Sequence, residues 1–252
     1  MEAYTGFAYV YDTFMDNIPY EEWAEYVAGL LGELSVETGS SITELGCGTG
    51  KFTMQMAQRG YAMTGIDCSE DMLAVAMDRK LRHQDEDTTF LQMDMREFSL
   101  YENVDAMISV CDSMNYLIEE GDMEKTFRCV CEHLRDGGVF IFDMKTEYFY
   151  REVLGENTFA ENREECSFIW DNYFYDEEKI NEYILTIFNR EENGLYRKYE
   201  ETHYQRAYKV EDILTKAEKA GLEKVAVYDA FTHDAPKWDS ERIYVIVRKN
   251  SK

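Results

Sequence analysis

Apolar and polar residues in the first half of the chain follow two alternating periods. Short apolar runs predict strands, and the segments between them repeat their apolar positions every three to four residues, as helices do. The expected strands are 41–45, 62–68, 88–95, 104–110 and 139–144. The expected helices are 4–34, 51–60, 69–83 and 121–138. This alternation predicts βαβ units and a parallel, doubly wound sheet whose strand carboxyl ends share one edge.

The pattern changes after Lys145, where long aromatic runs alternate with a period of two. They predict antiparallel strands at 167–175, 179–188 and 195–208, and Asn193-Gly194 is a strong hairpin signal. A helix at 210–222 and strands at 224–231 and 242–249 follow. We therefore expect three segments: N-terminal helices and a ligand-binding core at 1–146, an inserted antiparallel β meander at 147–209, and the end of the core sheet at 210–252.

Composition narrows the range of partners. The 252 residues carry a formal net charge of −25, which makes a nucleic-acid partner unlikely at long range without excluding one. No apolar run approaches the roughly 20 residues of a membrane span, and no signal peptide is evident, so we expect a cytoplasmic protein without a membrane partner. The six cysteines form no C-x-x-C pair and the four histidines are far apart, so we expect free thiols and no metal site.

The stretch "ITELGCGTGKFT", residues 42–53, joins the first strand to a helix and carries glycine at 46, 48 and 50. Glycine lowers stability in such a place, so the bare backbone indicates the close approach of a ligand. The spacing G-x-G-x-G is not the dinucleotide pattern G-x-G-x-x-G, because Lys51 stands where the last glycine would fall. We expect Lys51 to point into solvent. The P-loop pattern is also missing.

This stretch resembles motif I of the class I methyltransferases that use S-adenosylmethionine, in which an acid precedes G-x-G-x-G. The resemblance implies an α/β, doubly wound Rossmann-like seven-stranded sheet, methyl transfer as the activity and S-adenosylmethionine as the cofactor. It also implies that Asp67 accepts bonds from the ribose hydroxyls and that Asp94 bonds the adenine amine, with the Met95 N–H on ring N1. A nicotinamide enzyme would also place an acid at Asp67, so Asp94 is the discriminating residue.

A narrower resemblance extends beyond this core. The tyrosine and aspartate at 11–12 and the segment "CDSMNYL" at 111–117 are similar to the small bacterial YqeM-like methyltransferases. In related folds a tyrosine from the N-terminal helix closes over the cofactor, which implies that role for Tyr11, with Tyr4 as the alternative. The implied cofactor-binding residues are Tyr11, Gly46, Cys47, Gly48, Gly50, Asp67, Cys68, Asp94, Met95 and Cys111.

The methyl acceptor is less well defined by the sequence. No strong catalytic motif is present, and methyl transfer from a sulfonium needs a base only when the nucleophile must lose a proton. The substrate-pocket candidates are Tyr116, Asn115, His203 and Arg206, and strand alternation places the last two on opposite faces. Residues 151–201 hold fourteen acidic and six basic side chains, which favours a small neutral or cationic acceptor. The alternatives are RNA or a ribosome-associated protein as acceptor, a cofactor-binding module without turnover and, more distantly, a dehydrogenase.

Overall fold

The computed structural model describes Asp12 and residues 19–191 and 193–251. Its main element is a seven-stranded sheet in the order β10-β11-β5-β4-β1-β2-β3. The strands are β1 (Ser41–Leu45), β2 (Ala62–Asp67), β3 (Thr89–Gln92), β4 (Val104–Ser109), β5 (Leu134–Lys145), β10 (Leu222–Asp229) and β11 (Arg242–Lys249). Neighbouring strands from β3 to β5 are parallel, whereas β11 is antiparallel to both β5 and β10. The predicted doubly wound sheet is confirmed.

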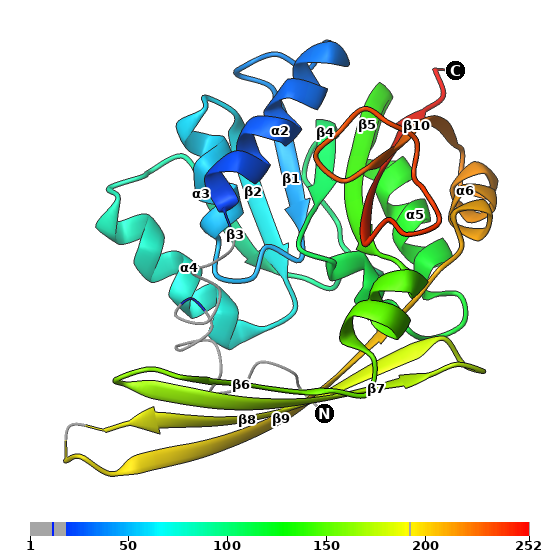
Figure 1. Cartoon of the computed structure of the whole chain (residues 1–252). Coiled ribbons are helices and arrows are strands. Elements are labelled where there is room, and N and C mark those ends of the chain that lie inside the picture. Colours follow the sequence, from blue (N-terminus) through cyan, green and yellow to red (C-terminus); the bar gives the residue numbers. More distant parts are fainter. Residues whose placement is uncertain (1–11, 13–18, 192, 252) are drawn as a thin grey trace.

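Helices cover both faces of this sheet (Figure 1). On one face, α2 (Tyr20–Glu33) and α3 (Lys51–Gln58) bury Trp23, Val27 and Phe52 against strand residues such as Ile42. On the other face lie α5 (Asp122–His133) and α6 (Val210–Lys219), while α4 (Glu70–Arg82) contacts β2 and β3. The Ser69 hydroxyl accepts a bond from the Met72 N–H at 3.3 Å, so α4 begins at the N-cap that the sequence indicates.

Three boundaries differ from the sequence-based expectation. The strand expected at 88–95 ends at Gln92, so Asp94 lies beyond it. The helix expected at 121–138 ends at His133, because Leu134 already has an extended backbone and pairs with Val104 of β4. Within the helix expected at 4–34, the structure describes α2 from Tyr20 to Glu33, with Pro19 as its N-cap. Tyr4 and Tyr11 lie outside the described residues.

A second, four-stranded antiparallel sheet follows β5, in the order β6-β7-β8-β9. Its strands are β6 (Thr158–Asn162), β7 (Cys166–Tyr175), β8 (Ile180–Arg190) and β9 (Tyr196–Arg206). The last three confirm the predicted meander. The sequence analysis missed β6, which is only five residues long, and the π-helix η2 (Phe149–Leu154) before it. Both supply aromatic side chains to a small core shared with β7 and β8.

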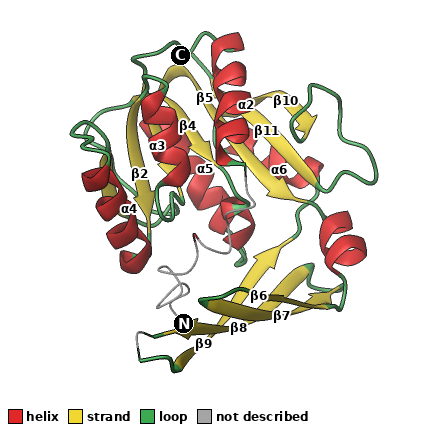
Figure 2. Cartoon of the chain, turned by 60° about the vertical axis from the view of Figure 1, so that its left-hand side comes forward, coloured by secondary structure: helices red, strands yellow, loops and turns green. Residues whose placement is uncertain are grey.

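The four-stranded sheet lies across the carboxyl ends of the main-sheet strands (Figure 1), and the rotated view in Figure 2 shows the two sheets as separate layers. One face of β9 is turned inward: Glu201, His203 and Gln205 are buried, whereas Tyr204 is exposed. The second sheet therefore covers the edge where the strand ends place ligand-binding groups.

Among the described residues, none of the helices is long and apolar enough to cross a membrane.

Candidate cofactor site

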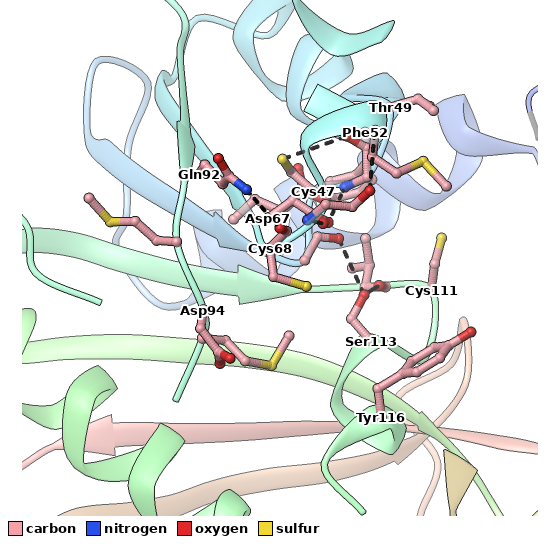
Figure 3. Close-up of a pocket in the computed structure, with 18 of the residues that line it drawn as sticks. Cys47, Thr49, Phe52, Asp67, Cys68, Gln92, Asp94, Cys111, Ser113 and Tyr116 are labelled. Atoms are coloured by element: carbon pink, nitrogen blue, oxygen red, sulfur yellow. Dashed lines mark hydrogen bonds between the residues drawn. The ribbon is translucent and has the colours of Figure 1, made fainter. Parts of the chain in front are cut away.

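A cavity of about 660 Å³ opens at the carboxyl edge of the main sheet. Its lining comes from the loop after β1, the ends of β2 and β3, and the short 3₁₀ helix η1 (Ser113–Tyr116) after β4 (Figure 3). Among the candidates in the described residues, eight cofactor candidates and one substrate candidate line it. The cofactor candidates are Gly46, Cys47, Gly48, Asp67, Cys68, Asp94, Met95 and Cys111, and the substrate candidate is Tyr116. Gly50 is not among the lining residues.

The three glycines of the loop have left-handed backbones, with φ of 71°, 51° and 72° at Gly46, Gly48 and Gly50. A Cβ on Gly46 would lie 2.7 Å from the Ser113 hydroxyl oxygen, and a Cβ on Gly50 would lie 2.6 Å from the Phe90 ring. A Cβ on Gly48 would meet none of the described residues within 4 Å. The expectation that all three glycines make room for a ligand therefore needs correction. Packing against the protein's own side chains requires Gly46 and Gly50, and only Gly48 faces open space.

This difference between the glycines gives a matched pair of variants. Gly50→Ala should lower the free energy of unfolding by about 3 kcal/mol, because a left-handed alanine and a methyl group pressed on Phe90 both destabilise the fold. Gly48→Ala should lower it by only about 1 kcal/mol and should instead weaken S-adenosylmethionine binding. Urea denaturation and titration calorimetry with S-adenosylhomocysteine measure the two effects. Equal loss of stability in both variants would contradict the assignment.

Asp67 ends β2, as predicted, and its carboxylate holds the glycine loop. Its two oxygens accept bonds from the Gly48 N–H at 2.8 Å and the Ser69 N–H at 2.9 Å. Burial raises the pKa of Asp67, and these backbone bonds oppose the shift. The carboxylate faces the cavity in Figure 3, and each oxygen has a second lone pair for a ligand hydroxyl. The ribose role implied by the sequence thus has a suitable acceptor in place.

Asp67→Asn should weaken S-adenosylhomocysteine binding by about 1.5–3 kcal/mol, the range for bonds to a charged group. The amide keeps one acceptor oxygen, so Asp67 loses only one of its bonds from the Gly48 and Ser69 N–H groups and the fold should persist. Calorimetry measures the affinity, and Asp71→Asn, an acid elsewhere on the cavity wall, is the control. Unchanged affinity in the Asp67 variant would show that another residue holds the ribose.

Asp94 lies two residues beyond the end of β3 and lines the cavity, but it has a cationic partner that the sequence did not indicate. Arg96 donates from Nε to Asp94 at 2.9 Å and from Nη1 to Asp122 at 3.0 Å. The bonds from Arg96 hold the pKa of Asp94 below its usual value. Asp94 is therefore a carboxylate whose position Arg96 fixes, and a ligand amine at this place would share oxygens that already accept bonds from Arg96.

Glu44 in β1 is a cavity residue that the candidate set omitted, although the motif itself contains an acid before its first glycine. The side chain is only 2% exposed, and the Thr53 hydroxyl donates a hydrogen bond to its carboxylate. Burial raises the pKa of Glu44 to about 8, against the opposing effect of the Thr53 bond. A buried acid thus lies in the wall of a cavity that is expected to take a cation.

Lys51 does not point into solvent, contrary to the expectation. Its ammonium group lies 3.4 Å from the Asp12 carboxylate and 5.4 Å from the centre of the Tyr20 ring. The carboxylate of Asp12 and the face of the Tyr20 ring both attract the ammonium group, and they hold the side chain against the protein. Lys51 also lines the cavity.

The segment "CDSMNYL" is held in place by other parts of the chain. Cys111 and Asp112 both have positive φ, 58° and 55°, and the Asp112 N–H donates to Asp143 at 2.9 Å. The Asp112 carboxylate accepts bonds from Arg242 at 2.8 Å and from the Gln205 amide of β9 at 2.7 Å. The Ser113 hydroxyl lies 3.3 Å from the Gly46 carbonyl oxygen. Burial raises the pKa of the Cys111 thiol.

The four substrate-pocket candidates separate into two groups. Tyr116 lines the cavity, and its hydroxyl lies 3.4 Å from Nδ1 of His203. Asn115 is fully buried, and its amide bonds the backbone of Lys145 and the Arg206 carbonyl. The Arg206 guanidinium donates to the carbonyls of residues 118 and 178 on the other face of β9. The structure thus corrects the candidate set: Asn115 and Arg206 bind backbone groups, His203 is buried behind Tyr116, and only Tyr116 lines the cavity.

Comparisons with known proteins agree with this geometry. Residues 42–138 match the family described as a methyltransferase domain. The chain is 34% identical over 250 residues to "Putative methyltransferase YqeM" of Bacillus subtilis (strain 168), across 98% of this chain and 97% of that protein. A crystal structure of a S-adenosylmethionine-dependent methyltransferase from Clostridium acetobutylicum matches with a TM-score of 0.87 and 28% identity, across 98% of this chain and 99% of that one.

A more distant match covers part of the chain. The chain is 31% identical over 136 residues to the dTDP-3-amino-3,4,6-trideoxy-alpha-D-glucopyranose N,N-dimethyltransferase of Streptomyces venezuelae. The aligned region covers 53% of this chain and 55% of that protein.

The sheet order, the glycine loop, Asp67 at the end of β2 and Asp94 just beyond β3 together define a class I methyltransferase that uses S-adenosylmethionine. The chain belongs to this family and, by its full-length match, to the group that contains YqeM. The cofactor supplies a methyl group on a sulfonium. The residues fit it, because the open space beside Gly48 and the carboxylates of Asp67 and Asp94 offer room and hydrogen-bond acceptors.

Proposed function

We propose that this methyltransferase acts on a small molecule and that the methylated atom is an amine nitrogen. The observation that carries the proposal is the position of the cavity, at the strand ends and beside Tyr116, with the four-stranded sheet across that edge. A volume of about 660 Å³ is that of a small-molecule site. In this proposal residues 147–209 act as the cover over the acceptor.

Charge supports a neutral or cationic acceptor. The cover is acidic, with fourteen Asp or Glu and six Lys or Arg in residues 151–201, and this potential attracts amines. The partial match to a sugar N,N-dimethyltransferase adds an amino sugar to the acceptors worth testing. In-line transfer to a neutral amine asks the protein mainly to align the two reactants and to exclude water.

RNA is the second candidate acceptor, and it finds less support. A polyanion needs a run of unpaired cations, whereas the cations of the cavity wall already have acidic partners. Lys51 pairs with Asp12, and Arg96 pairs with Asp94 and Asp122. The net charge of −25 opposes long-range attraction to phosphate.

The test is a screen of purified protein against small amines, amino sugars, phenols, thiols and carboxylates, with tRNA and ribosomal subunits as separate arms. Release of S-adenosylhomocysteine reports turnover, and the Asp67→Asn variant is the control for cofactor-dependent signal. We expect turnover with amine-bearing small molecules. Turnover confined to tRNA or ribosomal subunits would overturn the small-acceptor proposal, and cofactor binding without turnover in any arm would favour a binding module.

A further inference from the structure

Three side chains from two separate elements form a line that begins at the cavity. Tyr116 of η1 lines the cavity, and its hydroxyl oxygen lies 3.4 Å from Nδ1 of His203. Nε2 of the same ring lies 3.3 Å from the Glu201 carboxylate. His203 and Glu201 are two residues apart on the inward face of β9, with side chains only 1% and 6% exposed.

We propose that Tyr116, His203 and Glu201 form a proton relay that removes a proton from the methyl acceptor. The proposal rests on the proposed function of the cavity and adds the groups that prepare the acceptor. Tyr116 is the catalytic residue, because it is the member that lines the cavity. His203 and Glu201 are positioning residues that act through it.

The relay requires one arrangement of protons. In it, the Tyr116 hydroxyl donates to Nδ1 of His203, and the ring's own proton is on Nε2, which lies within ion-pair distance of Glu201 without hydrogen-bond geometry. In the step itself, the acceptor's ammonium or hydroxyl group gives a proton to the Tyr116 oxygen, while the Tyr116 proton passes to Nδ1. The products are an acceptor with a free electron pair, an unchanged tyrosine and an imidazolium beside a carboxylate. The arrangement of base and orienting acid follows the logic of the serine-protease triad.

Two aromatic rings and one acidic side chain pack against the imidazole of His203. From β8, the Tyr183 ring packs at 6.3 Å between centroids, and from η1 the Tyr116 ring packs edge-on at 6.0 Å. Glu201 supplies the negative charge on the same strand. The ammonium group of Lys145 at the end of β5 lies 6.0 Å from the centre of the Tyr183 ring and pairs with Asp112 at 3.5 Å. The direct ionic partner of His203 in the described residues is thus an acid.

The tautomer can be read directly, because the chain has only four histidines. Nitrogen correlation spectra of protein with ¹⁵N-labelled histidine, recorded at about pH 8.5, report which ring nitrogen carries the proton in each neutral ring. His203→Gln assigns the His203 signals by their loss. His133, whose Nδ1 lies 3.0 Å from the Cys129 carbonyl oxygen, must carry its proton on Nδ1 and serves as an internal reference for the opposite tautomer.

We expect the Nε2–H form at His203, and a shift of its Nδ1 signal in Tyr116→Phe. The control is Tyr204→Phe, which removes a hydroxyl from the outer face of β9 that donates to Glu182. A His203 proton on Nδ1, or signals that Tyr116→Phe leaves unchanged, would overturn the relay. This arm needs no methyl acceptor, so its result stands even if the acceptor screen fails.

A kinetic arm separates a relay from mere packing, using whichever acceptor class supports turnover. Tyr116→Phe should lower kcat by about 100-fold or more, within the range of general acid–base catalysis, with little change in S-adenosylhomocysteine affinity. Glu201→Gln should also lower kcat, and it should shift the Nε2 signal of His203 in the nitrogen spectra, because the carboxylate lies 3.3 Å from that nitrogen. An unchanged kcat together with an unchanged Nε2 signal would remove Glu201 from the proposal.

Discussion

Arg242→Met is expected to lower the free energy of unfolding by about 3–5 kcal/mol, the usual effect of removing one partner from a buried ion pair. Arg242 begins β11 and forms ion pairs with both Asp143 and Asp112. Asp143 is fully buried, and burial raises its pKa even with Arg242 beside it. Burial would also raise the pKa of Asp112, but Lys145 and Arg242 hold it below its usual value. Without Arg242, the buried carboxylate of Asp143 has lost its cation.

Urea denaturation of Arg242→Met, of Asp143→Asn and of the double variant that combines them measures this effect. The double variant should be less destabilised than the sum of the single variants, with a coupling free energy of about 1–3 kcal/mol. Arg135→Met is the control, because its ion pair with Asp105 is half exposed and should contribute about 1 kcal/mol or less. A loss in Arg242→Met no larger than that of the control would show that the network does not depend on this cation.

Glu44→Gln is expected to make the protein without cofactor more stable above about pH 8, by an amount on the order of 5 kcal/mol. Burial raises the pKa of Glu44 from 4.5 to about 8, so between these values the folded chain holds a proton that the unfolded chain has lost. Stability of the wild type therefore falls as pH rises from 4.5 to 8. The amide of the variant has no charge to bury, so its stability does not fall with pH for this reason. The stability advantage of Glu44→Gln over the wild type therefore grows between pH 4.5 and 8.

The same substitution should weaken cofactor binding at high pH. S-adenosylmethionine carries a sulfonium and an ammonium group, and an ionised Glu44 in the cavity wall attracts them. Cofactor affinity in the wild type should therefore rise between about pH 6.5 and 8.5, and less so in Glu44→Gln. Melting temperature and calorimetry across pH test both effects, with Glu70→Gln, an exposed acid on the same cavity, as control. Identical pH dependence in wild type and Glu44→Gln would contradict the argument.

The residues that the sequence predicted well are those whose role depends on neighbours along the chain. The period of apolar residues predicted the strands of the main sheet, and Asp67 could be placed because it follows directly on an apolar run. The glycine loop was found by spacing alone. The reason for each glycine was incomplete, because the residues that exclude a Cβ lie later in the chain: Phe90 of β3 at Gly50, and Ser113 of η1 at Gly46.

The contacts that the sequence could not predict join distant parts of the chain. Arg242 reaches Asp112 across 130 positions, and Asn115 bonds the carbonyl of Arg206 across 91 positions. Nothing in the local pattern of "CDSMNYL" shows that its asparagine amide is used by the backbone while its tyrosine faces the cavity. Strand alternation did separate His203 from Arg206, but the identity of the buried face depended on packing against η1.

The bonds around Asp112 have a consequence for how acceptor specificity can change. Gln205 of the covering sheet binds Asp112, and the next residue, Ser113, contacts the glycine loop at Gly46. A ligand that shifts β9 therefore alters the loop that holds the cofactor, and linkage requires the cofactor to affect acceptor affinity by the same factor. A substitution in the cover at a position other than Gln205 leaves this connection to the cofactor loop in place. A cover exchanged whole between relatives would keep cofactor affinity only if it retained a donor at position 205.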